Sequence, residues 1–367
     1  MEKTDIQKGM NHPKYSVLMA VYAKDNPDWF GFAVDSMSNQ EQQTAGVRKM
    51  NTKVFAARVK DSEVLMRSSS GGMFTALSDA IFRENGAVAC AVYDYEEHRT
   101  VFRLITSAAE RDAARGSKYM QAYPGNIFCE CECWLQSNPG RNILFVGTGC
   151  QADGFRRFTE KKGFSGRVYT VDIICHGVPS PLIWDEYAKY IEEKYGGRIE
   201  FLSFKDKRKN WHYPTPLVKM NGKEHYIRDY VKIFYSQCAL RPSCYVCPYA
   251  SMSRSVDMTI GDYWHIEEKM PDFYSPDGNS LVLIYTERGM QLFDMLKADI
   301  DYEESDTESC WQNNLEKPTP VSPRREQFWR DYEEKGIAYI LNEYGRIPEK
   351  QIIKDKLAVA LRSLQKR

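Results

Sequence analysis

Short apolar runs alternate with helical patterns along most of the chain. The runs predict buried strands at 53–59, 87–93, 142–146, 168–174, 256–260 and 280–285, and apolar spacing predicts helices at 73–83, at 289–297 and beyond Pro318. Residues 142–174 show strand, helix and strand within about 30 residues, which indicates a parallel βαβ unit with a right-handed crossover. We therefore expect an α/β (α+β) fold with a mixed sheet and flanking helices.

The overall charge gives no reason to expect nucleic acid or an anionic membrane as a partner. The 367 residues include 50 Lys+Arg and 50 Asp+Glu, so their formal charges cancel. The apolar run at 16–23 is too short for a membrane span or for the core of a signal peptide. We expect a cytoplasmic protein without a membrane span.

The ten cysteines are more than packing requires. In the cytoplasm they would stay reduced, so their number indicates metal binding or redox chemistry. Cys244 and Cys247 form a C-x-x-C motif before a proline, a spacing that lets two thiolates reach one metal centre. Cys150 and Cys175 follow two neighbouring predicted strands, whose carboxyl ends meet in one crevice. Four thiolates there suit a four-iron cluster or a structural zinc, although packing alone could explain Cys150 or Cys175.

The other cysteines carry weaker signals. Cys129, Cys131 and Cys133 lie on a predicted helix, where the first and last share a face and the middle one points away. We interpret them as substitutions on a helix surface, with extra metal binding as the less favoured alternative. The remaining three are expected to be structural: Cys90, Cys238 and Cys310.

Two further segments could bind a cofactor. The sequence Ser-Ser-Ser-Gly-Gly at 68–72 precedes a predicted helix, where hydroxyls and exposed amides either bind phosphate or cap the helix. The sequence Gly-Ser-Lys-Tyr at 116–119 could place Lys118 near the pyrimidine edge of a flavin and Tyr119 against its ring, or it could be an ordinary surface pair. The chain has no G-x-G-x-x-G and no P-loop motif. His176, beside Cys175, could tune a redox potential, relay a proton or be structural.

Six motifs in order resemble those of the coenzyme F420 hydrogenase/dehydrogenase beta-subunit family of iron–sulfur flavoproteins, across residues 50–310. They are Ser-Ser-Ser-Gly-Gly at 68–72, Gly-Ser-Lys-Tyr at 116–119, Gly-Thr-Gly-Cys-Gln at 147–151, Ile-Ile-Cys-His-Gly-Val-Pro-Ser-Pro at 173–181, Cys-Tyr-Val-Cys-Pro at 244–248 and Asp-Met-Thr-Ile-Gly-Asp-Tyr-Trp at 257–264.

The resemblance implies a flavin-dependent oxidoreductase in which a 4Fe–4S cluster exchanges single electrons with FAD. It implies that the flavin reacts with an unidentified small-molecule substrate and that an external donor such as a ferredoxin supplies electrons. The implied cluster ligands are Cys150, Cys175, Cys244 and Cys247. The implied flavin-binding residues are Ser70, Gly71, Gly72, Lys118, Tyr119 and Gln151.

The N-terminal segment departs from this family. Many relatives begin with a ferredoxin-like module rich in cysteine, whereas no cysteine precedes Cys90 here. Residues 15–40 instead resemble the opening strand and helix of a GT-A-type glycosyltransferase, without its metal-binding D-x-D. We expect a glycosyltransferase-like fragment and linker at 1–45, the redox domain at 50–310 and a charged helical tail at 311–367.

Three functional hypotheses follow. The first is an iron–sulfur flavoprotein oxidoreductase, with a polysaccharide-synthesis context suggested by the N-terminal fragment. The second is a non-catalytic cytoplasmic interaction protein with a structural zinc held by four cysteines. The third is a glycosyltransferase, which only the first 40 residues favour.

Overall fold

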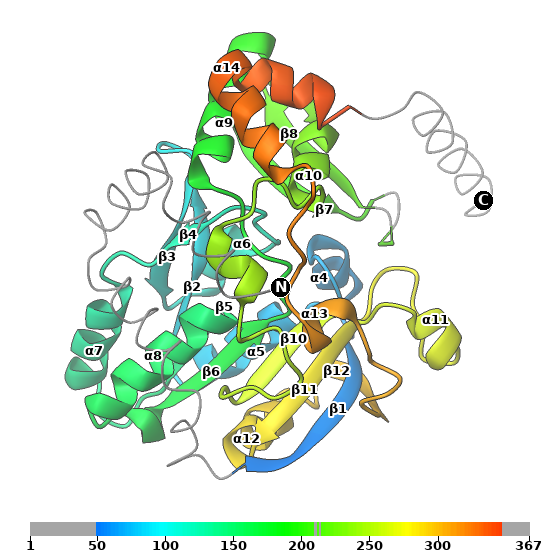
Figure 1. Cartoon of the computed structure of the whole chain (residues 1–367). Helices are drawn as coiled ribbons and strands as arrows, with labels where there is room; N and C mark the ends of the chain where they lie inside the picture. The colour runs from blue at the N-terminus through cyan, green and yellow to red at the C-terminus, as the bar shows by residue number, and fades with distance from the viewer. Residues whose placement is uncertain (1–48, 209–210, 213, 347–367) are drawn as a thin grey trace.

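The structure is a computed structural model that describes residues 49–346, except 209–210 and 213 (Figure 1). The glycosyltransferase-like segment at 1–45 and the last part of the expected tail lie outside the described residues. Their predictions therefore stay predictions.

A nine-stranded mixed sheet forms the larger part of the molecule, as the sequence predicted. Its strand order is β12 (Ile300–Ser305), β1 (Lys49–Val59), β11 (Ser280–Thr286), β10 (Met258–Asp262), β6 (Val168–Ile173), β5 (Ile143–Thr148), β2 (Ala87–Asp94), β3 (Arg99–Ile105) and β4 (Ala122–Tyr123). Strands β10, β6, β5 and β2 run parallel to their neighbours in this group, and antiparallel pairs flank them. The expected βαβ unit is confirmed as β5, α8 (Gly149–Lys161) and β6.

Helices cover both faces of this sheet because its central strands are apolar on both sides. On one face, Leu144 of β5 belongs to the same buried cluster as residues of α4 (Ser62–Arg67), α5 (Met73–Arg83), α6 (Ala108–Ala114) and α12 (Glu287–Asp294). On the other face, Phe145 stacks on Phe155 of α8 at 4.4 Å between ring centroids, and α7 (Ile127–Ser137) packs beside it. This alternation follows from the two-residue period of a strand.

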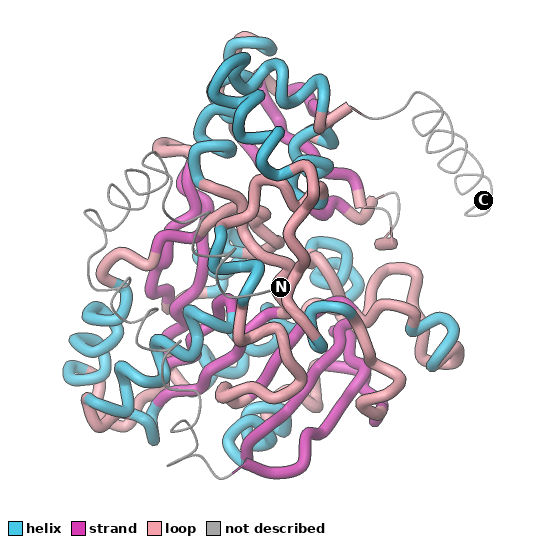
Figure 2. The backbone as a smooth tube through the Cα atoms, in the orientation of Figure 1, coloured by secondary structure: helices cyan, strands magenta, loops and turns pink. Residues whose placement is uncertain are grey.

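A second hydrophobic cluster lies beyond the carboxyl ends of the parallel strands and was not predicted. Its elements are α9 (Pro181–Tyr195), β7 (Phe201–Asp206), β8 (Thr215–Met220), β9 (Lys223–Tyr226), α10 (Arg228–Tyr235) and α14 (Arg325–Glu343). The three strands form an antiparallel sheet, and Trp184, Tyr230 and Phe328 are fully buried among the helices. Figure 2 shows these helices at the top of the molecule, above the strands of the large sheet.

Short elements complete the described chain. They are η2 (Ser165–Arg167), η3 (Pro242–Val246), α11 (Ile266–Lys269) and α13 (Asn313–Glu316). Within 49–346, helices are too short or too polar to cross a membrane.

Candidate functional site

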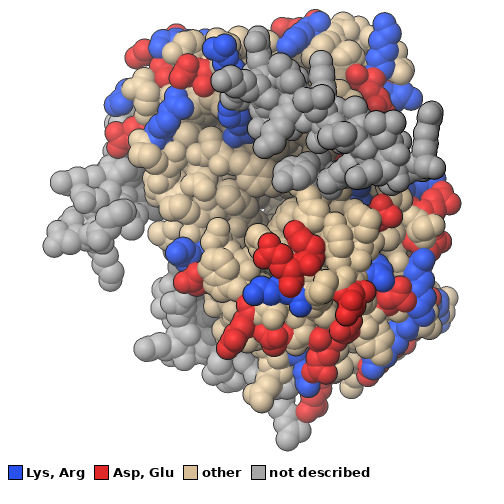
Figure 3. Space-filling model, turned by 90° about the vertical axis from the view of Figure 1, so that its right-hand side faces the viewer, with Lys and Arg blue, Asp and Glu red and all other residues tan. Residues whose placement is uncertain are grey.

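A cavity of about 480 Å³ lies between the large sheet and the second cluster. This volume is within the range of cofactor and small-molecule sites. Its lining comes from the carboxyl ends of β5, β6 and β10, from the loop before α5, and from Lys205 and Tyr235 of the second cluster. Seen from the side in Figure 3, charged residues gather above and below a surface that is mostly uncharged.

The structure brings all four predicted cysteine ligands to this cavity. Cys150 lies in the first turn of α8, Cys175 follows β6, and Cys244 and Cys247 lie in and just after η3. The chain that follows Cys175 is held in place because residues 178–180 pair with residues 239–241. The Arg241 N–H donates to the Val178 carbonyl and the Ser180 N–H donates to the Ala239 carbonyl, both at 2.9 Å.

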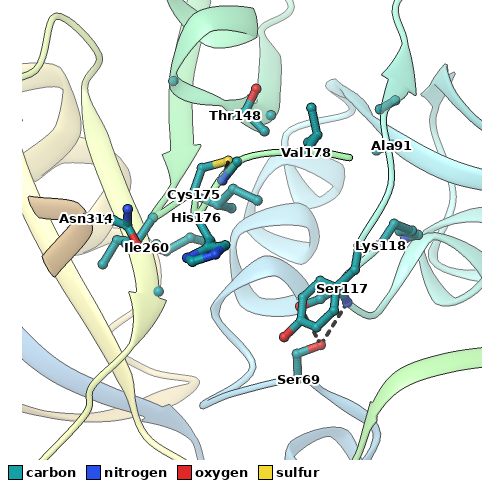
Figure 4. Close-up of a pocket in the computed structure, with 18 of the residues that line it drawn as sticks. Ser69, Ala91, Ser117, Lys118, Thr148, Cys175, His176, Val178, Ile260 and Asn314 are labelled. Carbon is teal, nitrogen blue, oxygen red and sulfur yellow. Dashed lines mark hydrogen bonds between the residues drawn. The ribbon is translucent and has the colours of Figure 1, made fainter. Parts of the chain in front are cut away.

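Each of these four sulfur atoms has a hydrogen-bond contact, which at Cys247 comes from the backbone of Tyr249. The N–H of Gly177 donates to Cys175 Sγ at 3.4 Å, and the N–H of Val178 donates to Cys244 Sγ at 3.5 Å. The Thr148 hydroxyl lies 3.2 Å from Cys150 Sγ. Hydrogen bonds to sulfur stabilise thiolate ligands and tune the potential of iron–sulfur clusters. Figure 4 shows Thr148 and Val178 near Cys175 and His176.

Without a metal, burial favours the protonated form of three of these thiols. Burial raises the pKa of Cys175, Cys244 and Cys247, the last to about 12, and the charges of the neighbouring cysteines raise each of these pKa values further. The hydrogen bond from Val178 and the charge of Arg241 partly oppose this effect at Cys244. A positively charged metal centre would convert the thiols to thiolates, so the donor set fits a metal site.

A single zinc ion and a 4Fe–4S cluster place different demands on four cysteine sulfurs. A zinc ion needs four ligands at about 2.0–2.3 Å from one point. Among the described residues, no three His, Cys, Asp or Glu side chains converge in a way that could hold one metal ion. In a 4Fe–4S cluster each cysteine binds a different iron, so the sulfurs line a cavity without meeting at one point.

The serine- and glycine-rich segment lies between the sheet and the cavity. Ser69, Ser70 and Gly72 line the cavity, and α5 begins after Gly72 without a side-chain cap among the described residues. The Ser70 hydroxyl donates to the Asn279 carbonyl at 2.8 Å. Gly71 does not line the cavity, because it packs against β1 and β11. The first amides of α5 are therefore the part of this segment best suited to an anion.

Lys118 and Tyr119 line the cavity, but their polar groups already have partners. The Lys118 ammonium donates to the carbonyls of Ala114 and Arg115 at the end of α6, and burial lowers the pKa of Lys118 to about 8. The Tyr119 ring stacks on Phe234 at 4.5 Å and on Phe204 at 5.3 Å. It therefore belongs to the aromatic packing of the second cluster. In Figure 4, dashed lines join Ser117, beside Lys118, to Ser69.

Gln151 and His176 also line the cavity. The Gln151 side chain caps α8 through Thr148, and its Nε2 donates to the Ala122 carbonyl at 3.2 Å. Burial lowers the pKa of His176, whose Nε2 has no hydrogen-bond partner among the described residues.

Several lining residues carry signals that the sequence analysis missed. The hydroxyls of Thr75 and Thr100 are buried without a hydrogen-bond partner in the described chain, although both residues line the cavity. An unpartnered buried hydroxyl is costly unless a ligand or water satisfies it. Lys205 and Asp262 form a largely buried ion pair in the cavity wall, and Arg254 pairs with Asp172 at 2.8 Å beside the cysteines.

The other cysteines lie mostly away from this site. Cys131 is buried on α7, whereas Cys129 and Cys133 are exposed on its opposite side, as the helical spacing predicted. Cys238 and Cys310 are buried outside the lining, whereas Cys90 is buried and is part of the lining.

Comparisons with protein-family models identify one family. Residues 54–126 match the model of the N-terminal part of the coenzyme F420 hydrogenase/dehydrogenase beta subunit, and residues 140–309 match the model of its C-terminal part. A chain of the xenon-derivatized F420-reducing nickel–iron hydrogenase complex from Methanosarcina barkeri is similar at 18% identity and a TM-score of 0.47, over 79% of this chain and 89% of that chain. No curated protein matches the sequence.

Proposed function

The chain belongs to the coenzyme F420 hydrogenase/dehydrogenase beta-subunit family, and from this premise we propose that it is an iron–sulfur flavoprotein oxidoreductase. Membership of the family implies a redox function. The observation that supports the finer proposal most strongly is the lining of one cavity by four cysteines and by the serine- and glycine-rich loop. One cofactor would be a 4Fe–4S cluster on Cys150, Cys175, Cys244 and Cys247, and the other would be FAD.

The protein's own groups would set the charge around the cluster. The amides of Gly177 and Val178 would stabilise thiolate charge on Cys175 and Cys244. The positive charge of Arg254 lowers the pKa of Cys247, although burial and the neighbouring cysteines dominate. When bound, the cluster supplies single electrons and the flavin supplies two-electron chemistry.

The residues around the start of α5 would hold the flavin phosphates. The uncapped amides there attract anions, and the unpartnered hydroxyls of Thr75 and Thr100 could donate to phosphate oxygens. Lys118 would add positive charge at this end of the cavity, because its amine lies in the same lining.

The Lys205–Asp262 pair would contact a small-molecule redox substrate. Asp262 accepts a hydrogen bond from Trp211 at 3.3 Å, which fixes the carboxylate and leaves the ammonium to donate further bonds into the cavity. An external donor such as a ferredoxin, a polysaccharide-synthesis context and a cytoplasmic location complete the proposal. The context depends on residues 15–40, which lie outside the described residues.

Substitution of one cysteine tests the cluster ligands. We expect Cys244→Ser to lose most of its iron and its absorption near ~400 nm, because a four-cysteine cluster loses a ligand. Cys129→Ser is the matched control, since Cys129 is exposed on α7 away from the cavity, and it should keep both. Iron analysis and circular dichroism on anaerobically purified protein provide the measurement. Unchanged iron in folded Cys244→Ser would rule out the ligand assignment.

A further inference from the structure

A buried lysine outside the predicted site contacts α4, the loop that follows α4 and a third segment that is distant in sequence. Lys207 follows β7 and is only 4% exposed. Its ammonium donates to the carbonyls of Leu65 at 2.6 Å, Ser70 at 2.7 Å and Asp277 at 2.6 Å. These acceptors belong to α4, to the cofactor loop at 68–72 and to the loop before β11. One side chain just after β7 thus connects the cofactor loop to the loop before β11.

The geometry matches an ammonium group. It has three N–H donors, and three carbonyl oxygens accept them. A neutral amine has two N–H groups and a lone pair, so it cannot donate to all three. Gly278, at φ +122°, allows this approach, because a Cβ there would lie 2.9 Å from Lys207 Nζ.

The same loop is held from its other side. The Ser69 hydroxyl accepts the Ser117 N–H at 2.9 Å, and the Ser70 hydroxyl donates to the Asn279 carbonyl at 2.8 Å. Lys207 supplies the contact to the Ser70 carbonyl, close to the start of α5. Loss of that contact would free the loop that precedes the proposed phosphate site.

We propose that Lys207 is a positioning residue whose ammonium group holds the loop at 68–72 in its cofactor-binding conformation, so that flavin affinity depends on the charge of Lys207. The inference rests on the proposed function, since it takes FAD as the ligand of the loop.

The surroundings of Lys207 bring its titration close to neutral pH. Burial lowers the pKa of Lys207 to about 7, Lys205 on β7 lowers it further, and Asp262 on β10 and Asp277 oppose the shift. On α4, Glu63 and Arg67 pair with each other at the surface. The ammonium therefore loses its charge, and one of its hydrogen bonds, as the pH rises through about 7.

The sign of this effect separates positioning from stability. Because the pKa of Lys207 is lower in the folded protein than its ordinary value of 10.5, folding releases a proton above pH 7, and this group's contribution to stability increases with pH. Flavin affinity, in contrast, should decrease with pH. If flavin affinity were lost because the whole protein became less stable, affinity and stability would decrease together as the pH rises.

A titration of the flavin-free, full-length protein with FAD, followed by flavin fluorescence, tests the proposal. For a group with a pKa near 7, wild-type affinity should fall about tenfold between pH ~6 and ~8. Lys207→Met should bind more weakly than wild type at pH ~6 and show no such pH dependence. The exposed Lys223→Met is the matched control and should keep the wild-type profile. A wild-type profile in Lys207→Met would overturn the proposal.

Hydrogen exchange without flavin gives a second, independent result. Peptides covering 65–72 and 275–279 should exchange faster in Lys207→Met than in Lys223→Met. If wild type binds no FAD at any pH, the proposed function fails, while faster exchange still supports the Lys207 contact. Equal exchange in both variants would contradict that contact. If Lys207→Met does not fold, Lys207→Arg replaces it, and its permanent charge predicts affinity that is constant with pH.

Discussion

At Gly71, the absence of a side chain lets the loop at 68–72 pack directly on the sheet. A Cβ at this position would lie 2.4 Å from the Ala57 carbonyl oxygen and 2.6 Å from the Ser280 nitrogen. Both are backbone atoms of paired strands, β1 and β11, so they cannot move without disturbing the sheet. The Gly71 N–H also donates to the Ser280 hydroxyl at 2.9 Å. The loop reaches the cavity because glycine lets it lie directly on the sheet.

The Gly71→Ala substitution should therefore destabilise the protein. We expect the free energy of unfolding to fall by roughly 1–3 kcal/mol, because the added methyl group overpacks the contact with β1 and β11. Urea denaturation measures the change. Gly166→Ala serves as the control, since a Cβ there meets no atom within 4 Å. Equal midpoints for Gly71→Ala and wild type would show that the loop has room to move.

At the residue scale, sequence reasoning brought four cysteines to one cavity but did not single out the threonines that also line it. Cys150 and Cys175 could be placed because they follow predicted parallel strands, and the C-x-x-C motif identified the other pair. Thr75 and Thr100 carried no signal, because a threonine in an apolar pattern is unremarkable until the structure shows its hydroxyl unpartnered.

Helix α8 links the Cys150 segment to the chain that follows the C-x-x-C motif. Asp153, buried on this helix, accepts hydrogen bonds from Arg156 and Arg157 on the same helix. It also accepts one from Tyr249 at 2.9 Å and one from Ser255 at 2.7 Å. A single carboxylate thus fixes the start of α8 against the segment that follows Cys247.

Replacing Asp153 with asparagine should weaken the contact between α8 and the segment that follows the C-x-x-C motif. We expect Asp153→Asn to lose about 3 kcal/mol of stability, because partly buried guanidinium groups lose their counter-charge, and to bind less iron. Asp294→Asn, an exposed change on α12, is the matched control. Urea denaturation and iron analysis measure both effects, and wild-type values for Asp153→Asn would contradict the assigned role.

The same carboxylate predicts a dependence of stability on pH. Burial raises the pKa of Asp153, but Arg156 and the hydrogen bonds from Ser255 and Arg157 outweigh it, so the pKa lies below its ordinary value of 3.8. Its contribution to stability is complete above that value and is lost as the pH falls through the lowered pKa. Lowering the pH should therefore reduce the difference in the free energy of unfolding between wild type and Asp153→Asn.

Among the elements, strands with unbroken apolar runs and helices with regular apolar spacing, such as α5, were predicted, whereas strands of mixed polarity such as β9 were not. The β5–α8–β6 unit could be predicted because glycines and charged residues flank its apolar strands in the sequence. The small sheet was missed, since β9 is polar and largely exposed. Helix α9 could have been found, because Ser180 and Pro181 mark its start and Ile183, Tyr187 and Ile191 recur at helical spacing.

At the scale of the whole molecule, the cavity exists because the large sheet and the second cluster meet across it. Residues beyond 311 contribute to the second cluster, since α14 buries Phe328 and Trp329 beside α9 and α10. No local pattern could predict this packing, because α14 begins 90 residues after the end of α10 and even further after α9. The Lys207 contacts also join residues that are far apart in the sequence. They connect the chain after β7 to the loop at 68–72.

The central claim is that this cavity holds an iron–sulfur cluster together with FAD. The most direct test is the visible spectrum of the anaerobically purified full-length protein, with iron, zinc and flavin quantified. We predict a brown protein with about four irons and one FAD per chain, a broad shoulder near ~400 nm and flavin bands near ~450 nm. A colourless protein that contains zinc and no flavin would contradict the account and support a structural role for the four cysteines.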